Sequence, residues 1–261
     1  MQNSGQVCIL GFLEQTLLPE RDVSLLAVDA RMETGMKNVL REYGINLVEI
    51  PPYHELGEPV AGHADMQIIH IHDNILVCQP HLPVVIYQQL KEYGFDIYFG
   101  ETVLKKKYPL DVAYNVAIVG EIAFHNTKYT DRVIVNILSR LNIRLVHVNQ
   151  GYTKCSILPV SRNSIITDDP SVEKAACKEG IKVLKIPPQK KIFLHGLSYG
   201  FIGGTAGFIS KNVLAFAGNI DNLDSKDEIK DFLNEHNVKW VNLGYNEIYD
   251  YGSLVPLYEK P

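Results

Sequence analysis

The sequence predicts an α/β fold made of five repeated units, each with two strands, a helix and a third strand, closed into a ring. Three observations lead to this prediction. Five amphipathic helices each end at a glycine or asparagine, each helix is followed by a β-rich strand, and four pairs of short strands lie between these segments. One such unit cannot bury its apolar face alone. A ring of five units can, with the helices outside and the first strands of the pairs around a central channel.

The five helix ends are marked by residues that tolerate the left-handed backbone terminating a helix. These residues are Gly44, Gly94, Asn142, Gly180 and Asn237. Before each of them, apolar residues recur at helical spacing, which predicts one buried stripe per helix. The first stripe consists of Met36, Val39, Leu40 and Tyr43. Ahead of the last helix, Ser225 and Glu228 have the spacing of a capping box.

Four strand pairs are predicted, and each turns nine positions after the start of its first strand. The segments run from Asp65 to Asn74, from Asp111 to Gly120, from Lys154 to Asn163 and from Gly203 to Asn212. Asparagine and glycine at the turns supply the positive φ that tight hairpins need. The first unit has no hairpin of its own. We therefore expect the strand at 252–257 to complete it.

Composition and charge narrow the classes of function. The chain has 261 residues, 46% of them hydrophobic, and a net charge of −5. This size and composition are typical of a folded protein, and we expect a single domain over residues 1–261. A mildly acidic chain is a poor candidate for binding nucleic acid or an anionic membrane, so neither partner is expected. The sequence gives no indication of the oligomeric state.

The cysteines and the start of the chain indicate a cytoplasmic protein. No charged start precedes the short apolar stretch at 7–13, so no signal peptide is expected. Cys8, Cys78, Cys155 and Cys177 show no CxxC spacing, which argues against a zinc ribbon or a redox motif. Free thiols suit a reducing compartment. Cys78 and Cys177 are predicted to be core residues.

The order of elements and the ending from Asp250 to Leu257 (Asp-Tyr-Gly-Ser-Leu-Val-Pro-Leu) resemble the pentein superfamily. These are guanidine-modifying enzymes with an α/β propeller fold, such as dimethylarginine dimethylaminohydrolases and amidinotransferases. The resemblance covers nearly the whole chain in pattern. It is nearest to an uncharacterised branch that carries His-x-Asp in the second unit and no C-terminal cysteine.

The resemblance also implies which residues of this chain stand at the active-site positions of the superfamily. Enzymes of the superfamily use a cysteine nucleophile on the last strand, in a Gly-x-Leu-Thr-Cys pattern, and this chain has Pro256 there. The fourth-unit histidine of the pattern His-x-Lys-Ser falls on Tyr152. The carboxylate that binds substrate is best matched by Asp65. A proline has no thiolate, so the resemblance implies a degenerate active site that lacks the catalytic cysteine.

Candidate ligand-binding residues lie where the strand starts are expected to meet at the channel mouth. They are Arg31, His63, Asp65, Asn115, Lys154, Thr205, Asp250 and Ser253. Carboxylates suit a guanidinium or ammonium ligand because they accept its N–H bonds. His63 and Asp65, two residues apart, should share one face of a strand. The alternative is that Asp65 and Asp111 only cap local backbone at strand starts.

Catalytic candidates are weaker and comprise His63, Asp65 and Cys155. A thiol near cations can have a lowered pKa, but a free cysteine more often packs as a small hydrophobic residue. His70 and His72 alternate on a strand, which is more typical of a wet hairpin face than of a metal pair, and no metal or cofactor is expected.

Two further groups of residues favour structural explanations. The glycine-rich segment at 196–207 leads into a strand, which indicates close backbone approach and not a phosphate loop. Tyr245, Tyr249 and Tyr251 are expected to fill the core, although Tyr249 or Tyr251 could wall a cation.

Three functions remain open on the sequence alone. The first is binding of a small guanidino-, amino- or amino-acid-like ligand in the channel, without the cysteine chemistry of the superfamily. The second is an enzyme with a rewired site that uses the His63 and Asp65 pair or Cys155. The third is a non-catalytic protein-interaction module. A deep polar pocket would favour the first two, and a plugged channel with an exposed apolar patch would favour the third.

Overall fold

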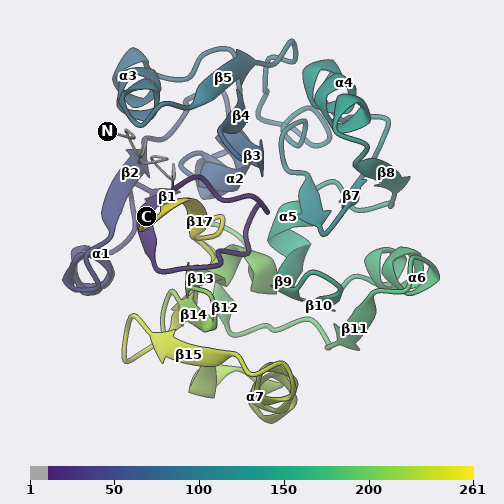
Figure 1. The fold of residues 1–261 in the computed structure, drawn as a ribbon. Helices are drawn as coiled ribbons and strands as arrows, with labels where there is room; N and C mark the ends of the chain where they lie inside the picture. Colours follow the sequence, from purple (N-terminus) through teal and green to yellow (C-terminus); the bar gives the residue numbers. More distant parts are fainter. Residues whose placement is uncertain (1–10) are drawn as a thin grey trace, which may run out of the picture.

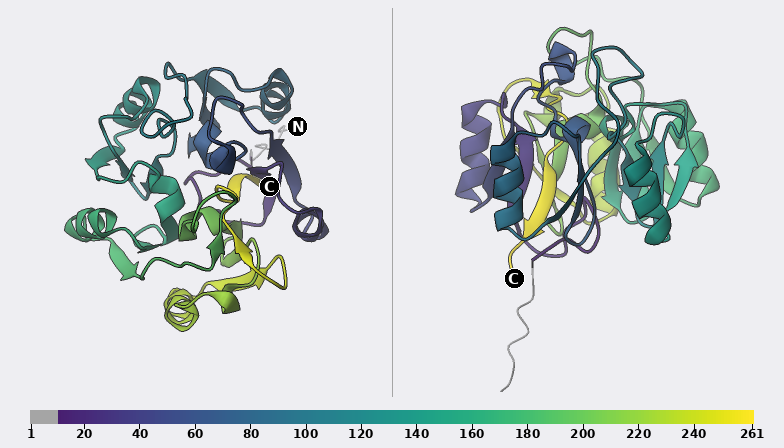
Figure 2. Two further views of the ribbon diagram at one scale, coloured as in Figure 1. Left: turned by 180° about the vertical axis from the view of Figure 1, so that it is seen from behind. Right: turned by 90° about the horizontal axis from the view of Figure 1, so that it is seen from above.

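The computed structural model describes residues 11–261, which form an α/β structure with mixed sheets. Five three-stranded sheets lie around a common centre, and a helix lies outside each of them (Figure 1). In every one of these sheets, one outer strand pairs antiparallel with the middle strand and the other pairs parallel with it. None of the sheets formed by residues 11–261 is closed on itself. Seen from the side, the helices stand on the periphery and the strands run alongside them (Figure 2).

The strands of the five sheets are taken here in chain order. The first sheet contains β1 (Val23–Asp29), β2 (Asn46–Ile50) and β17 (Val255–Glu259). The second contains β3 (Ile68–His72), β4 (Ile75–Cys78) and β5 (Asp96–Phe99). The third contains β6 (Ala117–Val119), β7 (Ile122–His125) and β8 (Arg144–His147). The fourth contains β9 (Ile157–Ser161), β10 (Ser164–Thr167) and β11 (Lys182–Lys185). The fifth contains β13 (Ala206–Ser210), β14 (Val213–Phe216) and β15 (Lys239–Asn242).

Five longer helices and several short elements connect the strands. The longer helices are α1 (Thr34–Glu42), α3 (Val84–Glu92), α4 (Arg132–Arg140), α6 (Pro170–Lys178) and α7 (Lys226–Glu235). The short helical turns are η1 (Glu58–Val60), α2 (Ala64–Gln67), α5 (Thr153–Ser156), η2 (Ile202–Thr205) and η3 (Ile220–Asn222). A two-stranded parallel sheet joins β12 (Ile192–Phe193) to β16 (Ile248–Tyr249).

The five predicted helix stops are confirmed. Their φ angles lie between +56° and +92°, in the left-handed region: Gly44, Gly94, Asn142, Gly180 and Asn237. In the first stripe, Met36 and Leu40 are buried, but Tyr43 is 48% exposed and does not belong to the core. The capping box is also wrong, because the Ser225 side chain makes no capping bond and its Oγ instead accepts a hydrogen bond from Gln189 Nε2 at 3.2 Å.

The four hairpins turn at the predicted places, but their backbone differs from the expectation. Gly120 has a φ of +59°, whereas Asp73 and not Asn74 takes the left-handed conformation in the second sheet. Asn163 and Asn212 do not have a positive φ. The predicted completion of the first unit is confirmed, since β17 pairs antiparallel with β1. This strand begins later than expected, after Gly252 and Ser253, whose φ angles of +67° and +72° turn the chain.

Three of the four segments expected to begin the first strands are helical turns. Residues 64–67, 153–156 and 202–205 form α2, α5 and η2, and the strands start only after them. His63 is the residue before α2 and Asp65 lies inside it, so the expected pairing of these two side chains on one strand face is wrong. Alternation of side chains between two faces holds for strands only.

The predicted central channel is filled. The segment that precedes β1 passes across the centre of the molecule (Figure 1), and Leu13, Thr16 and Leu17 are buried there. Two cavities lined by both Leu17 and Lys154 have volumes of only about 20 and 10 Å³. The larger has room for roughly one water molecule.

Several surface features also differ from the expectations. Cys177 and Tyr245 were expected in the core, but Cys177 is exposed and Tyr245 is 97% exposed. His70 is buried and its Nε2 bonds the carbonyl oxygen of Asp73 at 2.7 Å, so it does not lie on a wet hairpin face. Cys8 lies outside the described residues.

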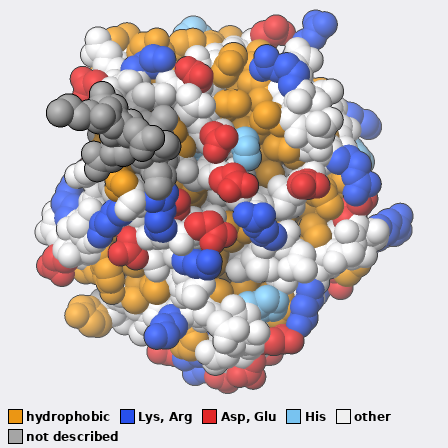
Figure 3. Space-filling model, in the orientation of Figure 1, with side chains coloured by type: hydrophobic (Ala, Val, Ile, Leu, Met, Phe, Trp, Pro, Cys, Tyr) orange, Lys and Arg blue, Asp and Glu red, His pale blue; other side chains and the backbone are white. Residues whose placement is uncertain are grey.

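On the face drawn in Figure 3, charged side chains of both signs are interspersed with hydrophobic ones. None of the described helices is both long and apolar enough to span a bilayer.

Candidate functional site

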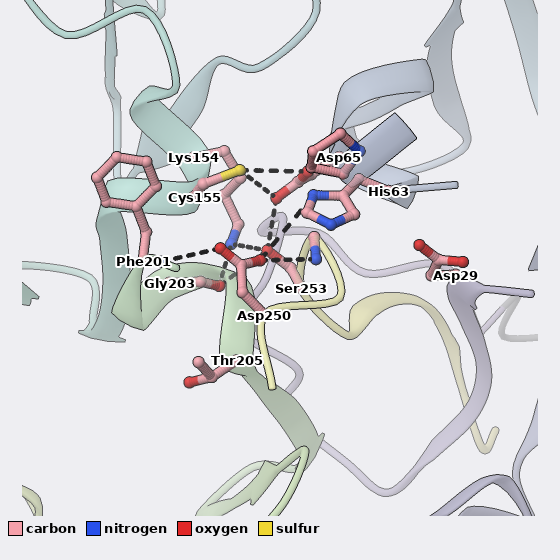
Figure 4. A network of polar contacts seen from close by, with 12 residues as sticks. Asp29, His63, Asp65, Lys154, Cys155, Phe201, Gly203, Thr205, Asp250 and Ser253 are labelled. Carbon is pink, nitrogen blue, oxygen red and sulfur yellow. Dashed lines mark hydrogen bonds and ion pairs between the residues drawn. The ribbon is translucent and has the colours of Figure 1, made fainter. Parts of the chain in front are cut away.

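Polar side chains from four separate segments meet at the centre of the molecule (Figure 4). We call them the central cluster: His63, Asp65, Asn115, Lys154, Cys155, Asp250 and Ser253. Each is at most 5% exposed. They come from α2 and the residue before it, from the loop before β6, from α5 and from the loop between β16 and β17. Buried ionisable groups are costly unless they are paired, so such a gathering is unusual for a purely structural core.

A chain of hydrogen bonds joins the Lys154 ammonium to the Asp65 carboxylate. Lys154 Nζ donates to Ser253 Oγ at 2.7 Å and to the Gly203 carbonyl oxygen at 3.3 Å. Ser253 Oγ donates in turn to Asp65 Oδ2 at 2.7 Å. Burial lowers the pKa of Lys154, although the negative charge of Asp65 opposes this effect. The serine hydroxyl therefore lies between the cation and the anion and touches both.

Cys155 contacts the same carboxylate. Its Sγ is 3.4 Å from Asp65 Oδ2 and accepts a hydrogen bond from Asn115 Nδ2 at 3.3 Å. The Asn115 side-chain oxygen accepts hydrogen bonds from the backbone N–H groups of Lys154 and Cys155, at 2.9 and 3.2 Å, which holds the start of α5 in place. Burial raises the pKa of Cys155 well above its ordinary value, and Asp65 raises it further. The thiol is therefore protonated at neutral pH.

His63 and Asp250 face each other at the edge of the cluster. His63 Nδ1 is 3.9 Å from Asp250 Oδ1, which is too long for a hydrogen bond. Both ring nitrogens of His63 are buried without a hydrogen-bond partner among the described residues. The Asp250 carboxylate accepts hydrogen bonds from the backbone N–H groups of Phe201 and Gly252, at 2.8 and 3.0 Å. Burial raises the pKa of Asp250, and His63 opposes the rise.

Two glycines let the chain approach this pair closely. A Cβ on Gly252 would lie 2.2 Å from His63 Cβ, and one on Gly204 would lie 1.9 Å from Asp250 Oδ1. The prediction that the glycine-rich segment serves close backbone approach is therefore confirmed. A side chain at either position would displace the imidazole or the carboxylate.

Arg31 and Thr205 lie outside the central cluster. Arg31 forms a bidentate ion pair with buried Asp29 and donates to the carbonyl oxygens of Glu58 and Pro59. The Thr205 hydroxyl donates to the Ile202 carbonyl oxygen within η2, at 2.7 Å. Asp29 and Thr205 lie apart from the cluster in Figure 4.

A half-buried row of aromatic rings lies beside the cluster. We call Tyr108, Tyr152 and Phe201 the aromatic row. The ring centroids of Tyr108 and Tyr152 are 5.7 Å apart, and those of Tyr152 and Phe201 are 6.4 Å apart. The Tyr152 hydroxyl donates to Asp111 Oδ2 at 2.5 Å, while Asp111 Oδ1 is buried with no partner among the described residues. Burial raises the pKa of Asp111 and the bond from Tyr152 lowers it. From the sequence, Asp111 could either face a ligand at the channel mouth or cap local backbone, and the aromatic row was not singled out.

One trio in the cluster has the chemistry of a metal-ligand set. A ring nitrogen of His63, a carboxylate oxygen of Asp65 and the sulfur of Cys155 all lie within 4.8 Å of one another. No metal was expected from the sequence, because the cysteines show no CxxC spacing and the pair His70 and His72 suited a hairpin face. Cys155 lies 90 residues from Asp65. Tertiary structure brings them together, through the contact of Cys155 Sγ with the Asp65 carboxylate.

Residues 27–255 match the model of a family described as a family of unknown function, DUF6873. The chain belongs to this family. No curated protein matches this DUF6873 member significantly in sequence.

Solved structures share the fold at low sequence identity. SxtG, an amidinotransferase from Microseira wollei in the saxitoxin biosynthetic pathway, has a TM-score of 0.58 and 10% identity, with 90% of this chain and 92% of that chain covered. An agmatine deiminase from C. jejuni has a TM-score of 0.53 and 12% identity, covering 88% and 90%. A dimethylarginine dimethylaminohydrolase has a TM-score of 0.53 and 9% identity, covering 84% and 92%. The expected resemblance to the pentein fold is confirmed at the level of the fold.

Proposed function

We propose that this DUF6873 member binds a small ligand carrying a guanidino, amino or amino-acid-like group at its central cluster. In this proposal residues 1–261 form one propeller domain of five units, located in the cytoplasm. The protein would not carry out the thiol reaction on the last strand. The free thiols of Cys78, Cys155 and Cys177 support a reducing compartment.

The observation that carries the proposal is the convergence of charged and nucleophilic side chains in the core. Asp65, Lys154 and Asp250 are ionisable, nearly inaccessible and supplied by three different segments. A hydrophobic centre would stabilise the fold at least as well, since buried ion pairs are often no better than apolar packing. A cluster of this kind at the centre of a fold shared with guanidino-modifying enzymes is therefore best explained by a ligand.

The aromatic row offers a place for the cationic end of that ligand. Asp111 has one carboxylate oxygen without a partner, and aromatic rings attract cations over their faces. Tyr152 links the two parts of the proposed site, because its hydroxyl bonds Asp111 and the next residues along the chain lead into α5. A guanidinium on Asp111 would place the rest of a small ligand toward Asp250 and Phe201.

The closed centre means that binding requires movement. The cavity beside Asp65 and Lys154 holds about 20 Å³, too little for a guanidinium group. The segment that carries Phe201 lies against Asp250, and the Phe201 N–H donates a hydrogen bond to the carboxylate. It is also held by the bond from Gly200 N–H to the Ile192 carbonyl oxygen and by the Phe201 ring, which lies near that of Tyr152. Residues 195–198 just before it are exposed. We propose that this segment lifts to admit the ligand.

Thermal-shift and calorimetric titrations test the binding. The probes are agmatine, L-arginine, methylated arginine and methylguanidine, with sodium chloride at matched ionic strength as the reference. We expect at least one probe to raise the melting temperature, and Asp111→Asn to weaken its binding at least tenfold. Asp224→Asn, an exposed aspartate paired with Lys191, is the matched control and should leave binding unchanged.

Failure would be equally clear. If no probe binds the wild-type protein, the ligand class is wrong and the filled centre favours an interaction module. If binding persists undiminished in Asp111→Asn and in Tyr152→Phe, the aromatic row is not the cation site. Tyr245→Phe, at an exposed ring, controls for the loss of a tyrosine hydroxyl.

A rewired thiol enzyme is a second candidate because Cys155 Sγ contacts Asp65 and lies within 4.8 Å of His63. The absence of a thiol at Pro256 does not exclude it. Incubation with the same probes followed by intact-mass spectrometry decides between the two. A covalent adduct on Cys155 that is lost in Cys155→Ser would establish the enzyme, and an unmodified mass after full incubation supports binding alone.

A further inference from the structure

We propose that His63, Asp65 and Cys155 form a binding site for a zinc ion. The inference goes beyond the proposed function, because a metal ion could occupy these three residues whether or not an organic ligand binds. Nitrogen, oxygen and sulfur from one histidine, one carboxylate and one cysteine are all established zinc ligands. Three protein ligands leave one tetrahedral position open, which is typical of zinc sites that also bind water or a substrate.

The distances suit such a site. With Zn–S and Zn–O bonds of roughly 2.3 and 2.0 Å at tetrahedral angles, the sulfur and oxygen atoms should be about 3.5 Å apart. Cys155 Sγ is 3.4 and 3.5 Å from the two oxygens of Asp65. The ligand atom of His63 lies within 4.8 Å of both. Coordination at tetrahedral angles would bring the His63 nitrogen to roughly 3.5 Å from the sulfur.

The imidazole of His63 gives an independent observation, because its ring nitrogens lack partners. Its side chain is 1% exposed, and neither ring nitrogen has a hydrogen-bond partner among the described residues. A buried imidazole without partners is costly for a folded protein. Coordination of one nitrogen would remove this cost. Asp250, with Oδ1 at 3.9 Å from Nδ1, would supply the carboxylate that commonly orients a metal-bound imidazole.

The groups around the trio are also those that a metal site needs. Asn115 Nδ2 donates to the sulfur of Cys155, and Ser253 Oγ donates to Asp65 Oδ2. Such bonds hold ligand atoms in place and stabilise their negative charge. The serine also separates Asp65 from the Lys154 ammonium, so the nearest cation does not contact the carboxylate directly.

The charges balance when a divalent cation is added. One ammonium, two carboxylates and one thiolate leave two negative charges in the cluster, and a zinc ion neutralises them. Binding would convert the Cys155 thiol to a thiolate, with its proton released to solvent. Softer ligands such as thiolate favour zinc over magnesium or calcium, which prefer oxygen ligands.

Metal analysis of the purified full-length chain tests this inference. All proteins carry Cys8→Ser and Cys177→Ser, so that Cys78, which is buried on β4, and Cys155 are the remaining thiols. We expect about one zinc per chain after metal removal and reloading, measured by mass spectrometry of the metal content. Competition with a chromophoric chelator should show at least a hundredfold weaker zinc binding in Cys155→Ser and in His63→Gln. Cys78→Ser and His195→Gln, the latter at an exposed histidine, are the controls and should bind as before.

A second readout covers the case in which Cys155→Ser does not fold. Cobalt loaded into the otherwise unchanged protein should give a thiolate-to-cobalt charge-transfer band and the visible absorption of a tetrahedral site. Absence of stoichiometric zinc, or a cobalt spectrum without the thiolate band, would overturn the inference. Zinc binding that is unchanged in both Cys155→Ser and His63→Gln would do the same. The organic probes are titrated separately into metal-free and zinc-loaded protein, so failure of either proposal shows by itself.

Discussion

The outer rim of this molecule and its centre differ in how closely the five three-stranded sheets resemble one another. At the rim, five helices end at a left-handed glycine or asparagine and continue into a strand paired parallel with its neighbour. At the centre, three short helical turns occupy corresponding places in their units yet carry unrelated side chains. The turn α2 brings Asp65, α5 brings Lys154 and Cys155, and η2 brings glycines and Thr205.

The difference shows which features a repeat constrains. The rim depends on backbone geometry, which one residue type can satisfy in every unit. The central turns share only a backbone position. Their side chains meet residues from other units, so each is free to differ where the chemistry requires it. Substitutions at the centre should therefore have larger and more specific effects than substitutions at the rim.

The largest effect is expected for Gly207→Ala, on β13 next to the centre. The added Cβ would lie 1.8 Å from the carbonyl oxygen of Leu254, so the two strands would have to separate. We expect a loss of about 3 kcal/mol or more in the free energy of unfolding, measured by urea denaturation. Gly35→Ala in α1 is the control: its Cβ meets nothing within 4 Å, and stability should stay equal or rise slightly. Equal effects at both positions would contradict the comparison.

Acid should lower the free energy of unfolding through a buried histidine that lies away from the central cluster. Burial lowers the pKa of His125 on β7 to about 4, although its bond to the Gly151 carbonyl opposes the shift. The unfolded chain binds a proton near pH 6.5 and the folded protein does not, so stability is complete above that pH and falls as pH drops toward 4. The loss should reach about 3 kcal/mol for this one group.

The slope of stability against pH measures this contribution. His125→Gln should flatten the decline between pH 6.5 and 4 relative to the wild-type protein, whatever its stability at neutral pH. His54→Gln, at a side chain that is 83% exposed, should leave the slope unchanged. If the slope of His125→Gln matches that of the wild-type protein, the histidine is not held neutral by burial.

A rim position should respond more weakly. Gly180 ends α6 with a φ of +76°, and an added Cβ would meet nothing within 4 Å. The cost of Gly180→Ala is then backbone strain alone, about 1 kcal/mol. Chemical denaturation of this variant beside Gly207→Ala compares the two regions directly. A loss at Gly180 as large as that at Gly207 would show that the rim tolerates change no better than the centre.

The smallest perturbation is chemical labelling of thiols in the native protein. Cys177 is exposed on α6, whereas burial raises the pKa of Cys78 above its ordinary range and raises that of Cys155 as well. Iodoacetamide should therefore modify Cys177 first, followed far more slowly by Cys78 and Cys155. Peptide mapping by mass spectrometry gives each rate. Rapid labelling of Cys155 at neutral pH would show that its thiolate is accessible.

The sequence predicted those parts of the fold that depend on local chemistry. Helix stops and hairpin positions follow from residue types that a short window contains. The closing strand was expected for another reason, because the first unit has no hairpin of its own. The central turns were predicted as strand starts because each lies nine positions before a hairpin turn. Their helical form depends on burial between sheets, which no window reveals.

The sequence predicted which residues meet at the candidate site better than it predicted the contacts between them. Asp65, Lys154, Asp250 and Ser253 were expected to meet, and they do. The contact of Cys155 with Asp65 joins residues 90 positions apart. Arg31 does not reach the cluster, because it forms an ion pair with Asp29, its near neighbour in the sequence. The contact of Cys155 with Asp65 follows from tertiary packing, so residue types alone could not assign it.

The pairing of β17 with β1 has a consequence for how the chain acquires its structure. Val23 and Glu259 are register partners, and the Glu259 carboxylate also bonds the backbone of Glu20 and Arg21. The first sheet therefore cannot be completed until the last strand has left the ribosome, while the other four sheets are each made from contiguous stretches of chain. Loop closure over more than 230 residues is slow compared with hairpin formation. Assembly should thus end with a late docking step, and before that step β1 presents an open edge to chaperones or to other nascent chains.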